Sequence, residues 1–271
     1  MEHIKVSVIM GIYNCDKYLD DSINSILNQT YENIELIMCD DGSIDNTLNI
    51  AKKYEKEYPQ KIKVIQNEKN MELNYTLNKC LKHANGQYIA RQDGDDVSVL
   101  DRIEKQVRFL EDNPQYAIVS SNVELFDENG KWGNGKIIEE PQKLDFYKGS
   151  PFCHAASMTR KEAFDEVGGY TVEKKLLRVE DYHLWYKMYQ KGYKGYNLQE
   201  VLYKIRDNKE AFKRRSFKSS INECRLRWRI FRDFKIPYTK YLYIIRPIIV
   251  SLIPRKVYKL LHKQKYKEEM I

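Results

Sequence analysis

The first ninety residues alternate between short apolar runs and longer stretches in which apolar residues recur with helical spacing. The apolar runs cover residues 6–10, 34–39, 62–65 and 88–90, and the stretches with helical spacing cover 17–27, 47–58 and 72–83. Apolar runs that alternate with helices in this way are typical of βαβ units on a mostly parallel sheet with helices on both faces. We therefore expect an α/β fold with an open, mostly parallel, twisted sheet flanked by helices.

The regular alternation ends near residue 96, and the next segment has the mixed pattern of an α+β region. A helix is expected over 101–111, where Asp101 and Glu104 have the spacing of a capping box. A strand is expected over 117–126. The Asn-Gly pairs at 129–130 and 134–135 predict turns.

Charge divides the chain into two parts. Residues 206–271 contain 19 Lys and Arg against 6 Asp and Glu, whereas residues 1–205 contain 27 against 33. We therefore expect an acidic globular domain over 1–205, with halves 1–96 and 97–205, and a basic helical extension over 206–271. With 42% hydrophobic and 12% aromatic residues, the chain is not a disordered polymer.

The cysteines and the N-terminus favour a cytoplasmic location. The five cysteines are scattered, with no pair at CxxC spacing. This pattern argues against a disulfide framework or a zinc ribbon and fits a reducing compartment. The first residues show no charged leader followed by a long apolar segment, so no export signal is expected.

Ligands of an open α/β sheet gather at the carboxyl ends of its strands, so the residues after each apolar run are candidates for a site. Three of the four ends carry distinctive residues, namely 11–14, 40–43 and 93–96. The end of the third run, residues 66–68, is ordinary. The candidate site is therefore expected around the first, second and fourth strands.

The segment Asp93-Gly94-Asp95-Asp96 gives the strongest local signal. On an extended segment, carboxylates two residues apart point to the same side and can share a hard cation. One or two carboxylates are typical of Mg²⁺ or Mn²⁺ held chiefly through substrate phosphates. A solvated acidic turn that caps the next helix would have the same sequence, so spacing alone leaves both interpretations open.

The second strand end offers a similar choice. Asp45 is expected to cap the helix that follows. Asp41, exposed beyond a buried strand, is better placed to accept a hydrogen bond from a ring N–H. Tyr13 on the neighbouring strand could stack on the same ring, although simple packing also accounts for a lone tyrosine.

Further candidates lie in the second half. Glu180 and Asp181 open an amphipathic helix that reaches about Gln190. The helix dipole favours acidic residues there, and a carboxylate at such a position can also serve as a general base. His154 lies in a strand-like run, and no second His or Cys at ligand spacing makes a zinc site with it.

Taken together, these segments closely resemble the family 2 glycosyltransferases of the GT-A fold, in particular the bacterial enzymes that assemble capsule, O-antigen and other surface polysaccharides. The resemblance spans residues 4–206 and is carried by the segments 6–14, 40–47, 88–96 and 179–181. It implies an inverting enzyme that moves a sugar from a nucleotide diphosphate sugar, with UDP the expected nucleotide, to a hydroxyl of a glycan or lipid-linked acceptor.

The resemblance also implies roles for the nucleotide-binding residues. Asp41 would hold the base, and Tyr13 would flank it. Asp95 would contact Mn²⁺ or Mg²⁺, and Asp93 would contact the ribose or the water shell of the metal. The family usually has proline where Gly11 stands, a difference that could loosen the nucleotide loop.

For the transfer itself, the resemblance assigns the general base to Asp181. Arg91 and His154 match positions where the family often carries residues near the diphosphate or the acceptor. Glu180, which precedes the expected base, is grouped with them.

The basic extension alternates charged with large apolar side chains. Its run 241–253 has 13 residues, against about 20 needed to span a bilayer, and Arg246 lies in its middle. We expect the extension to lie on the inner surface of the cell membrane, beside a lipid-linked acceptor. Packing on the catalytic body, or on a second subunit in a homodimer, accounts for the same pattern. No nucleic-acid-binding module is recognisable, so no nucleic-acid partner is expected.

Two other functions compete with this one. A sugar-phosphate nucleotidyltransferase on a similar sheet would need a phosphate loop rich in glycine and arginine after the first strand, which residues 11–14 lack. A non-catalytic nucleotide-sugar or glycan binding module of the same fold stays open. A binding module, however, would not need the combination of Asp41, Asp93, Asp95 and Asp181.

Overall fold

The computed structural model describes residues 4–207 and 217–268. Its strands are β1 (Val6–Ile12), β2 (Ile34–Asp40), β3 (Ile62–Gln66), β4 (Tyr88–Arg91), β5 (Val97–Ser98), β6 (Ile118–Asp127), β7 (Gly130–Gly135), β8 (Met158–Arg160) and β9 (Gly195–Arg206). Its α-helices are α1 (Asp16–Leu27), α2 (Thr47–Glu57), α3 (Leu73–Leu81), α4 (Arg102–Asp112), α5 (Lys161–Val167), α6 (Glu180–Gln190), α7 (Phe217–Asp233), α8 (Leu242–Leu252) and α9 (Arg255–Glu268). Short 3₁₀ helices include η1 (Lys143–Lys148) and η2 (Lys174–Leu176).

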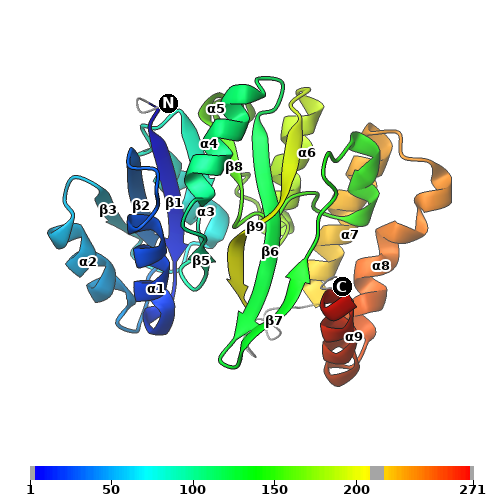
Figure 1. The fold of residues 1–271 in the computed structure, drawn as a ribbon. Helices are drawn as coiled ribbons and strands as arrows, with labels where there is room; N and C mark the ends of the chain where they lie inside the picture. Colours follow the sequence, from blue (N-terminus) through cyan, green and yellow to red (C-terminus); the bar gives the residue numbers. More distant parts are fainter. Residues whose placement is uncertain (1–3, 208–216, 269–271) are drawn as a thin grey trace.

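All the strands belong to one sheet in the order β3-β2-β1-β4-β8-β6-β9-β5, and β7 pairs with β6 (Figure 1). The first four strands along the chain are parallel to one another, as the alternating pattern predicts. Beyond β4 the sheet is mixed, because β8 is antiparallel to both β4 and β6, whereas β6 and β9 are parallel. The expected open α/β sheet flanked by helices is confirmed.

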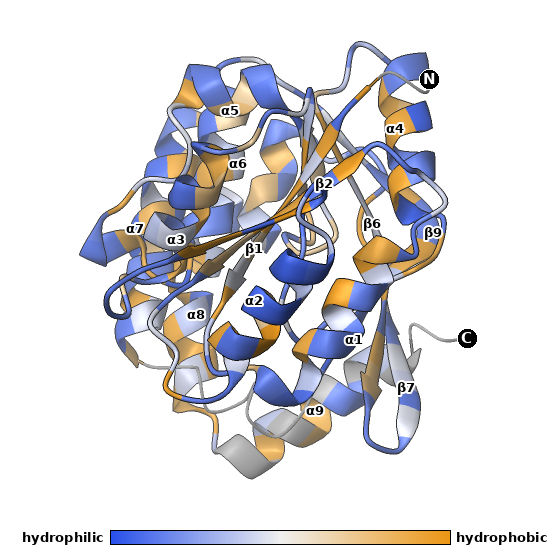
Figure 2. Cartoon of the chain, turned by 90° about the vertical axis from the view of Figure 1, so that its left-hand side faces the viewer, coloured by the Kyte–Doolittle hydropathy of each residue, from blue (hydrophilic) through white to orange (hydrophobic). Residues whose placement is uncertain are grey.

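Helices cover both faces of the sheet, with α3, α5, α6 and α7 on one side and α1 and α4 on the other (Figure 2). Successive side chains of a strand point to opposite faces. In β1, Ile9 accordingly packs in the core beneath α3 and α6, while Val8 and Met10 pack in the core beneath α1 and α4. Burial on both faces explains why these strands read as continuous apolar runs.

The basic extension is only partly separate from the body. Strand β9 ends at Arg206, next to the expected boundary. In α7, however, Leu226, Ile230 and Phe231 are buried in the same core as Trp185 of α6. Helix α7 therefore completes the core of the globular body.

The last two helices lie further out, at the right of Figure 1. Helix α8 buries Ile244 and Pro247, and α9 rests on β7 through Tyr266, which lies close to Gly133. A Cβ atom added at Gly133 would lie 3.0 Å from Cβ of Tyr266, so a larger residue would have to push the two apart by a few tenths of an ångström. Within the described residues, no helix has both the length and the apolar character needed to cross a bilayer.

Two local predictions are wrong. The pair Asn134 and Gly135 lies in strand β7 rather than in a turn. The other expected turn is present at residues 128–129, and Gly130 begins β7. Asp101 precedes α4 but makes no capping hydrogen bond with its side chain, which instead pairs with Lys105 at 2.9 Å. Glu104 accepts a hydrogen bond from Oγ1 of Thr30 at 2.6 Å, so a contact with a distant residue replaces the capping box.

Candidate active site

A cavity of about 540 Å³ lies at the carboxyl ends of β1, β2 and β4. Six of the predicted site residues line it: Gly11, Tyr13, Asp41, Asp93, Asp95 and Glu180. They come from four segments that are far apart in the sequence. Among the described residues, Arg91, His154 and Asp181 do not line this cavity.

Asp41 is buried at the end of β2, which corrects the expectation that it is exposed. Its Oδ1 accepts hydrogen bonds from Nδ2 of Asn67 and from the backbone N–H of Met71, both at 2.8 Å. Asn67 itself is buried and also donates to Oγ1 of Thr76 at 3.0 Å. The end of the third strand is therefore not ordinary, since Asn67 fixes the orientation of the Asp41 carboxylate.

The loops after β1 and β2 are tied to each other beside Tyr13, whose side chain is 47% exposed. The backbone N–H of Asn14 donates to Oγ of Ser43 at 3.1 Å. In return, Oδ1 of Asn14 accepts a hydrogen bond from the backbone N–H of Ile44 at 3.0 Å. The expected cap is confirmed, because Asp45 Oδ1 accepts from the first N–H of α2 at 3.0 Å.

The acidic segment after β4 forms a turn at Gly94 and Asp95, so the expectation of an extended segment is wrong. Gly94 is needed there, because an added Cβ would lie 2.8 Å from Sγ of Cys15. Arg206, at the end of β9, donates from Nε to the carbonyl of Asp95 at 3.0 Å. Its backbone N–H donates to Oδ1 of the buried Asp96 at 2.8 Å. Asp96 thus anchors the turn that presents Asp93 and Asp95 to the cavity.

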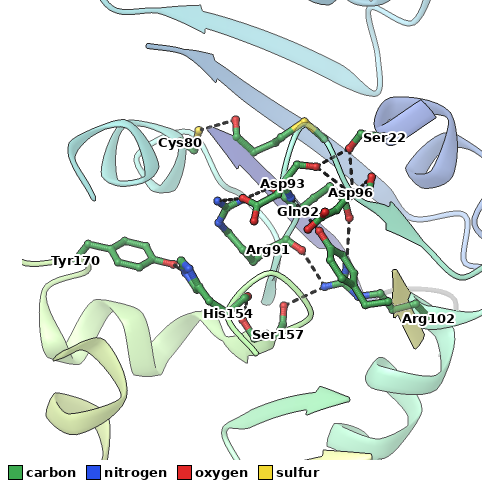
Figure 3. Close-up of polar contacts among 12 residues, drawn as sticks. Ser22, Cys80, Arg91, Gln92, Asp93, Asp96, Arg102, His154, Ser157 and Tyr170 are labelled. Atoms are coloured by element: carbon green, nitrogen blue, oxygen red, sulfur yellow. Dashed lines mark hydrogen bonds and ion pairs between the residues drawn. The ribbon is translucent and has the colours of Figure 1, made fainter. Parts of the chain in front are cut away.

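Arg91 is a positioning residue rather than part of the cavity wall. Its buried guanidinium forms an ion pair with the carboxylate of Asp93 and a hydrogen bond with the carbonyl of Gln92 (Figure 3). Burial disfavours this cation, but the charge of Asp93 and its hydrogen bond, together with the nearby Tyr170 and Tyr203, raise the pKa of Arg91 above its ordinary value. Arg102, also buried, donates from Nη2 to the carbonyl of Arg91 at 2.8 Å and so holds the end of β4 in place.

His154 lies on the far side of Arg91, where its Nε2 is 2.7 Å from the hydroxyl of Tyr170 (Figure 3). Burial and the charge of Arg91 lower the pKa of His154 to about 3, so the ring is neutral at physiological pH. Burial raises the pKa of Tyr170; Arg91 opposes this, and the carboxylates of Asp181, Glu180 and Asp93 add to it. Tyr170 therefore lies within electrostatic range of both the β4 turn and the start of α6.

Glu180 and Asp181 occupy the first turn of α6 and differ in what they face. Glu180 lines the cavity, and burial together with the charge of Asp181 raises its pKa to about 7. Asp181 accepts a hydrogen bond from Oγ of Ser150 at 3.1 Å. Burial raises the pKa of Asp181, and the charge of Glu223 on α7 contributes. A carboxylate with a raised pKa next to a ligand cavity is suited to accept a proton.

The acidic residues fit a metal that arrives with a ligand. Within residues 4–207 and 217–268, no three His, Cys, Asp or Glu side chains are grouped so that they could hold a metal ion. The cavity wall instead offers the carboxylates of Asp93 and Asp95. Two hard oxygen donors suit Mg²⁺ or Mn²⁺ when phosphate oxygens and water complete the coordination.

Comparison with known proteins identifies the family. The family model described as Glycosyl transferase family 2 matches residues 7–168, which is more than half of the chain. This chain belongs to glycosyl transferase family 2. The resemblance read from the sequence motifs is thereby confirmed, and so is the enzyme class.

Curated relatives of this family 2 glycosyltransferase come from bacteria, among other organisms. The chain is 48% identical to the putative glycosyltransferase EpsE of Bacillus subtilis, over 96% of this chain and 94% of EpsE. It is 34% identical to an Escherichia coli UDP-Gal:alpha-D-GlcNAc-diphosphoundecaprenol beta-1,3-galactosyltransferase, over 92% of each chain.

Solved structures support the GT-A fold of this glycosyltransferase. S. aureus TarS 1–349 in complex with UDP-GlcNAc matches with a TM-score of 0.69 at 21% identity, covering 91% of this chain and 72% of TarS 1–349. The mannosyltransferase PcManGT from Pyrobaculum calidifontis, in complex with GDP-Man and Mn²⁺, matches with a TM-score of 0.65 at 18% identity, covering 94% of this chain and 72% of PcManGT. At these identities, the likeness concerns the fold alone.

Proposed function

We propose that this glycosyltransferase inverts the anomeric carbon of a UDP-sugar as it transfers the sugar to a hydroxyl of a lipid-linked glycan during surface polysaccharide synthesis. The observation that carries the proposal is the single cavity lined by Asp41, Asp93, Asp95 and Glu180. The substrates of the E. coli relative, a UDP-sugar and a diphosphoundecaprenol-linked sugar, support the choice of donor and acceptor.

The donor is proposed to lie along the strand ends. Asp41, held by Asn67 and Met71, would accept a hydrogen bond from the ring N–H of the base, and the exposed ring of Tyr13 would stack on that base. Asp93 and Asp95 then face the ribose and the diphosphate. A bound Mn²⁺ or Mg²⁺ would neutralise negative charge on the departing diphosphate.

Asp181 is the proposed general base. It accepts the proton of the acceptor hydroxyl while that oxygen attacks the anomeric carbon from the face opposite the diphosphate. A new C–O bond forms as the bond to the diphosphate oxygen breaks, so the configuration inverts. The hydrogen bond from Ser150 and the fixed first turn of α6 orient the Asp181 carboxylate for this step.

A panel of nucleotide sugars, each with and without Mn²⁺, tests the donor assignment by thermal shift. We expect UDP-sugars to raise the Tm, and to do so more strongly with Mn²⁺, because a ligand at 100 times its Kd adds about 2.7 kcal/mol to the stability. Detection of free UDP and an elongated acceptor then separates an enzyme from a binding module. Absence of any shift with all nucleotide sugars would contradict the proposal, and release of pyrophosphate would indicate a nucleotidyltransferase.

We further propose that the enzyme works at the cytoplasmic face of the membrane, with α8 against an anionic lipid surface. One side of α8 exposes Leu242, Ile245, Ile249 and Leu252, and this apolar stripe follows helical spacing. Exposed arginines of the neighbouring α7 add positive charge. Apolar side chains together with basic ones suit a membrane interface rather than a buried helix contact.

The double variant Ile245→Asp/Ile249→Asp is expected to bind phosphatidylglycerol vesicles at least tenfold more weakly than the wild type in cosedimentation. Each inserted large side chain contributes about 1.5–3 kcal/mol, and the added charges repel the lipid. Leu100→Asp is the matched control, since Leu100 is also exposed but precedes α4. If the double variant binds vesicles normally but loses a dimer in sedimentation analysis, the stripe is a subunit contact instead.

A further inference from the structure

A second cavity, of about 310 Å³, lies between α7, α8 and the loop before α6. Its polar lining consists of two arginines, three serines and one glutamate: Arg178, Arg246, Ser219, Ser220, Ser251 and Glu223. Guanidinium and hydroxyl groups are donors that bind phosphate oxygens. The lining therefore resembles an anion site more than a sugar pocket.

The charge balance of this second cavity is positive. Glu223 is already paired with the buried Arg227, whose Nη2 and Nε lie 2.7 and 2.9 Å from its Oε1. Within the described ranges, no carboxylate lies within ion-pair distance of Arg178 or Arg246. The lining thus holds two guanidinium groups against one carboxylate, Glu223, which is already paired with Arg227. Arg178 is also within electrostatic range of Glu180 on the wall of the donor cavity.

The second cavity adjoins the reacting centre. Arg178 lines both this cavity and the donor cavity, and it lies three residues before Asp181. It has a φ of 69°, a left-handed conformation that is uncommon outside glycine. Glu223, on the wall of the second cavity, is close enough to Asp181 to affect its titration. A ligand in the second cavity would therefore lie near the proposed base and beside the donor cavity.

The second cavity also borders the apolar stripe of α8. Arg246 lies four residues after Leu242 and three before Ile249, so it neighbours both on the helix surface. A group held by Arg246 is thus next to the proposed lipid surface and, through Arg178, next to the donor cavity. We propose that the second cavity binds the phosphate or diphosphate that joins the acceptor sugar to its lipid, an inference that rests on the proposed function.

Binding of inorganic pyrophosphate, measured by calorimetry in EDTA with UDP present to fill the donor cavity, tests this site directly. We expect Arg246→Gln to weaken binding at least tenfold, and Arg246→Lys to retain part of it. Arg225→Gln is the matched control, because Arg225 is exposed on α7 and does not line the cavity. The inference is overturned if the wild type does not bind pyrophosphate, or if Arg246→Gln binds it as the wild type does.

Kinetic measurements show whether the phosphate bound in the second cavity belongs to the acceptor or to a membrane headgroup. With a short-chain diphosphate-linked sugar as acceptor, Arg246→Gln is expected to raise the KM for the acceptor at least tenfold and the KM for the donor less than twofold. With an alkyl glycoside of the same sugar, no difference between variant and wild type is expected. If Arg246→Gln weakens only the binding to phosphatidylglycerol vesicles, the arginine contacts membrane headgroups and the inference fails. If the wild type transfers sugar to no acceptor, the proposed function fails. The pyrophosphate measurement still tests whether the second cavity binds a diphosphate.

Discussion

Asp181→Asn is expected to abolish sugar transfer while donor binding is retained. Asparagine keeps the shape of the side chain and can still contact Ser150, but it cannot accept the proton of the acceptor hydroxyl. Loss of a general base costs about 10²–10⁴-fold in rate. Because Asp181 does not line the donor cavity, the Kd for the UDP-sugar should stay close to that of the wild type. Rates of product formation and calorimetric donor binding together check this result.

A control variant and a pH profile sharpen the test of Asp181. Asp165→Asn removes an exposed carboxylate on α5 that pairs with Lys161 at 2.7 Å, and it should leave turnover unchanged. Burial raises the pKa of Asp181, so the base is protonated at higher pH than an ordinary aspartate, and kcat should fall as the pH drops through that raised value. Turnover of Asp181→Asn near the wild-type level would remove Asp181 from the role of base.

Asp95→Asn is expected to reduce transfer about a hundredfold or more and to weaken the dependence on Mn²⁺, because the metal contributes several kcal/mol of charge stabilisation. Asp95 lines the donor cavity, and its backbone is held by Arg206, so the amide variant should keep the turn intact. A titration of Mn²⁺ against transfer rate, after removal of metal with EDTA, measures the change.

Asp112→Asn provides the comparison for Asp95→Asn, since Asp112 is exposed at the end of α4 and away from the donor cavity. It should respond to Mn²⁺ as the wild type does. Full activity of the wild type in EDTA would refute metal assistance. An unchanged Mn²⁺ response in Asp95→Asn would show that Asp95 does not contact the metal.

Local sequence patterns predict the elements of this molecule that depend on neighbouring residues. Periodicity located the parallel strands, because each strand is buried on both faces and each helix on one. The rule that ligands gather at strand ends then selected Asp41, Asp93 and Asp95, all of which line the donor cavity. Short-range geometry likewise accounts for the cap of α2 by Asp45.

Contacts between distant segments account for what the sequence did not reveal. Asn67 looked ordinary because its importance comes from Asp41, which lies 26 residues away. Arg91 comes at the end of an apolar strand, where ligand-binding residues are expected. Because successive side chains of a strand point to opposite faces, its side chain lies in the core, toward His154 and Tyr170 (Figure 3). The second cavity forms only when α7 and α8 pack against each other. A local sequence pattern does not predict that packing.

The tie between Arg206 and the turn of Asp95 and Asp96 has a practical consequence for dissecting this enzyme. A truncated chain that stops at residue 205, where the charge changes sign, would lose the guanidinium and the N–H that hold this turn. It would also uncover the surface that Leu226 and Ile230 shield. In such a fragment, loss of the proposed lipid contact could not be separated from damage to the donor cavity. Point substitutions on α8 avoid this problem.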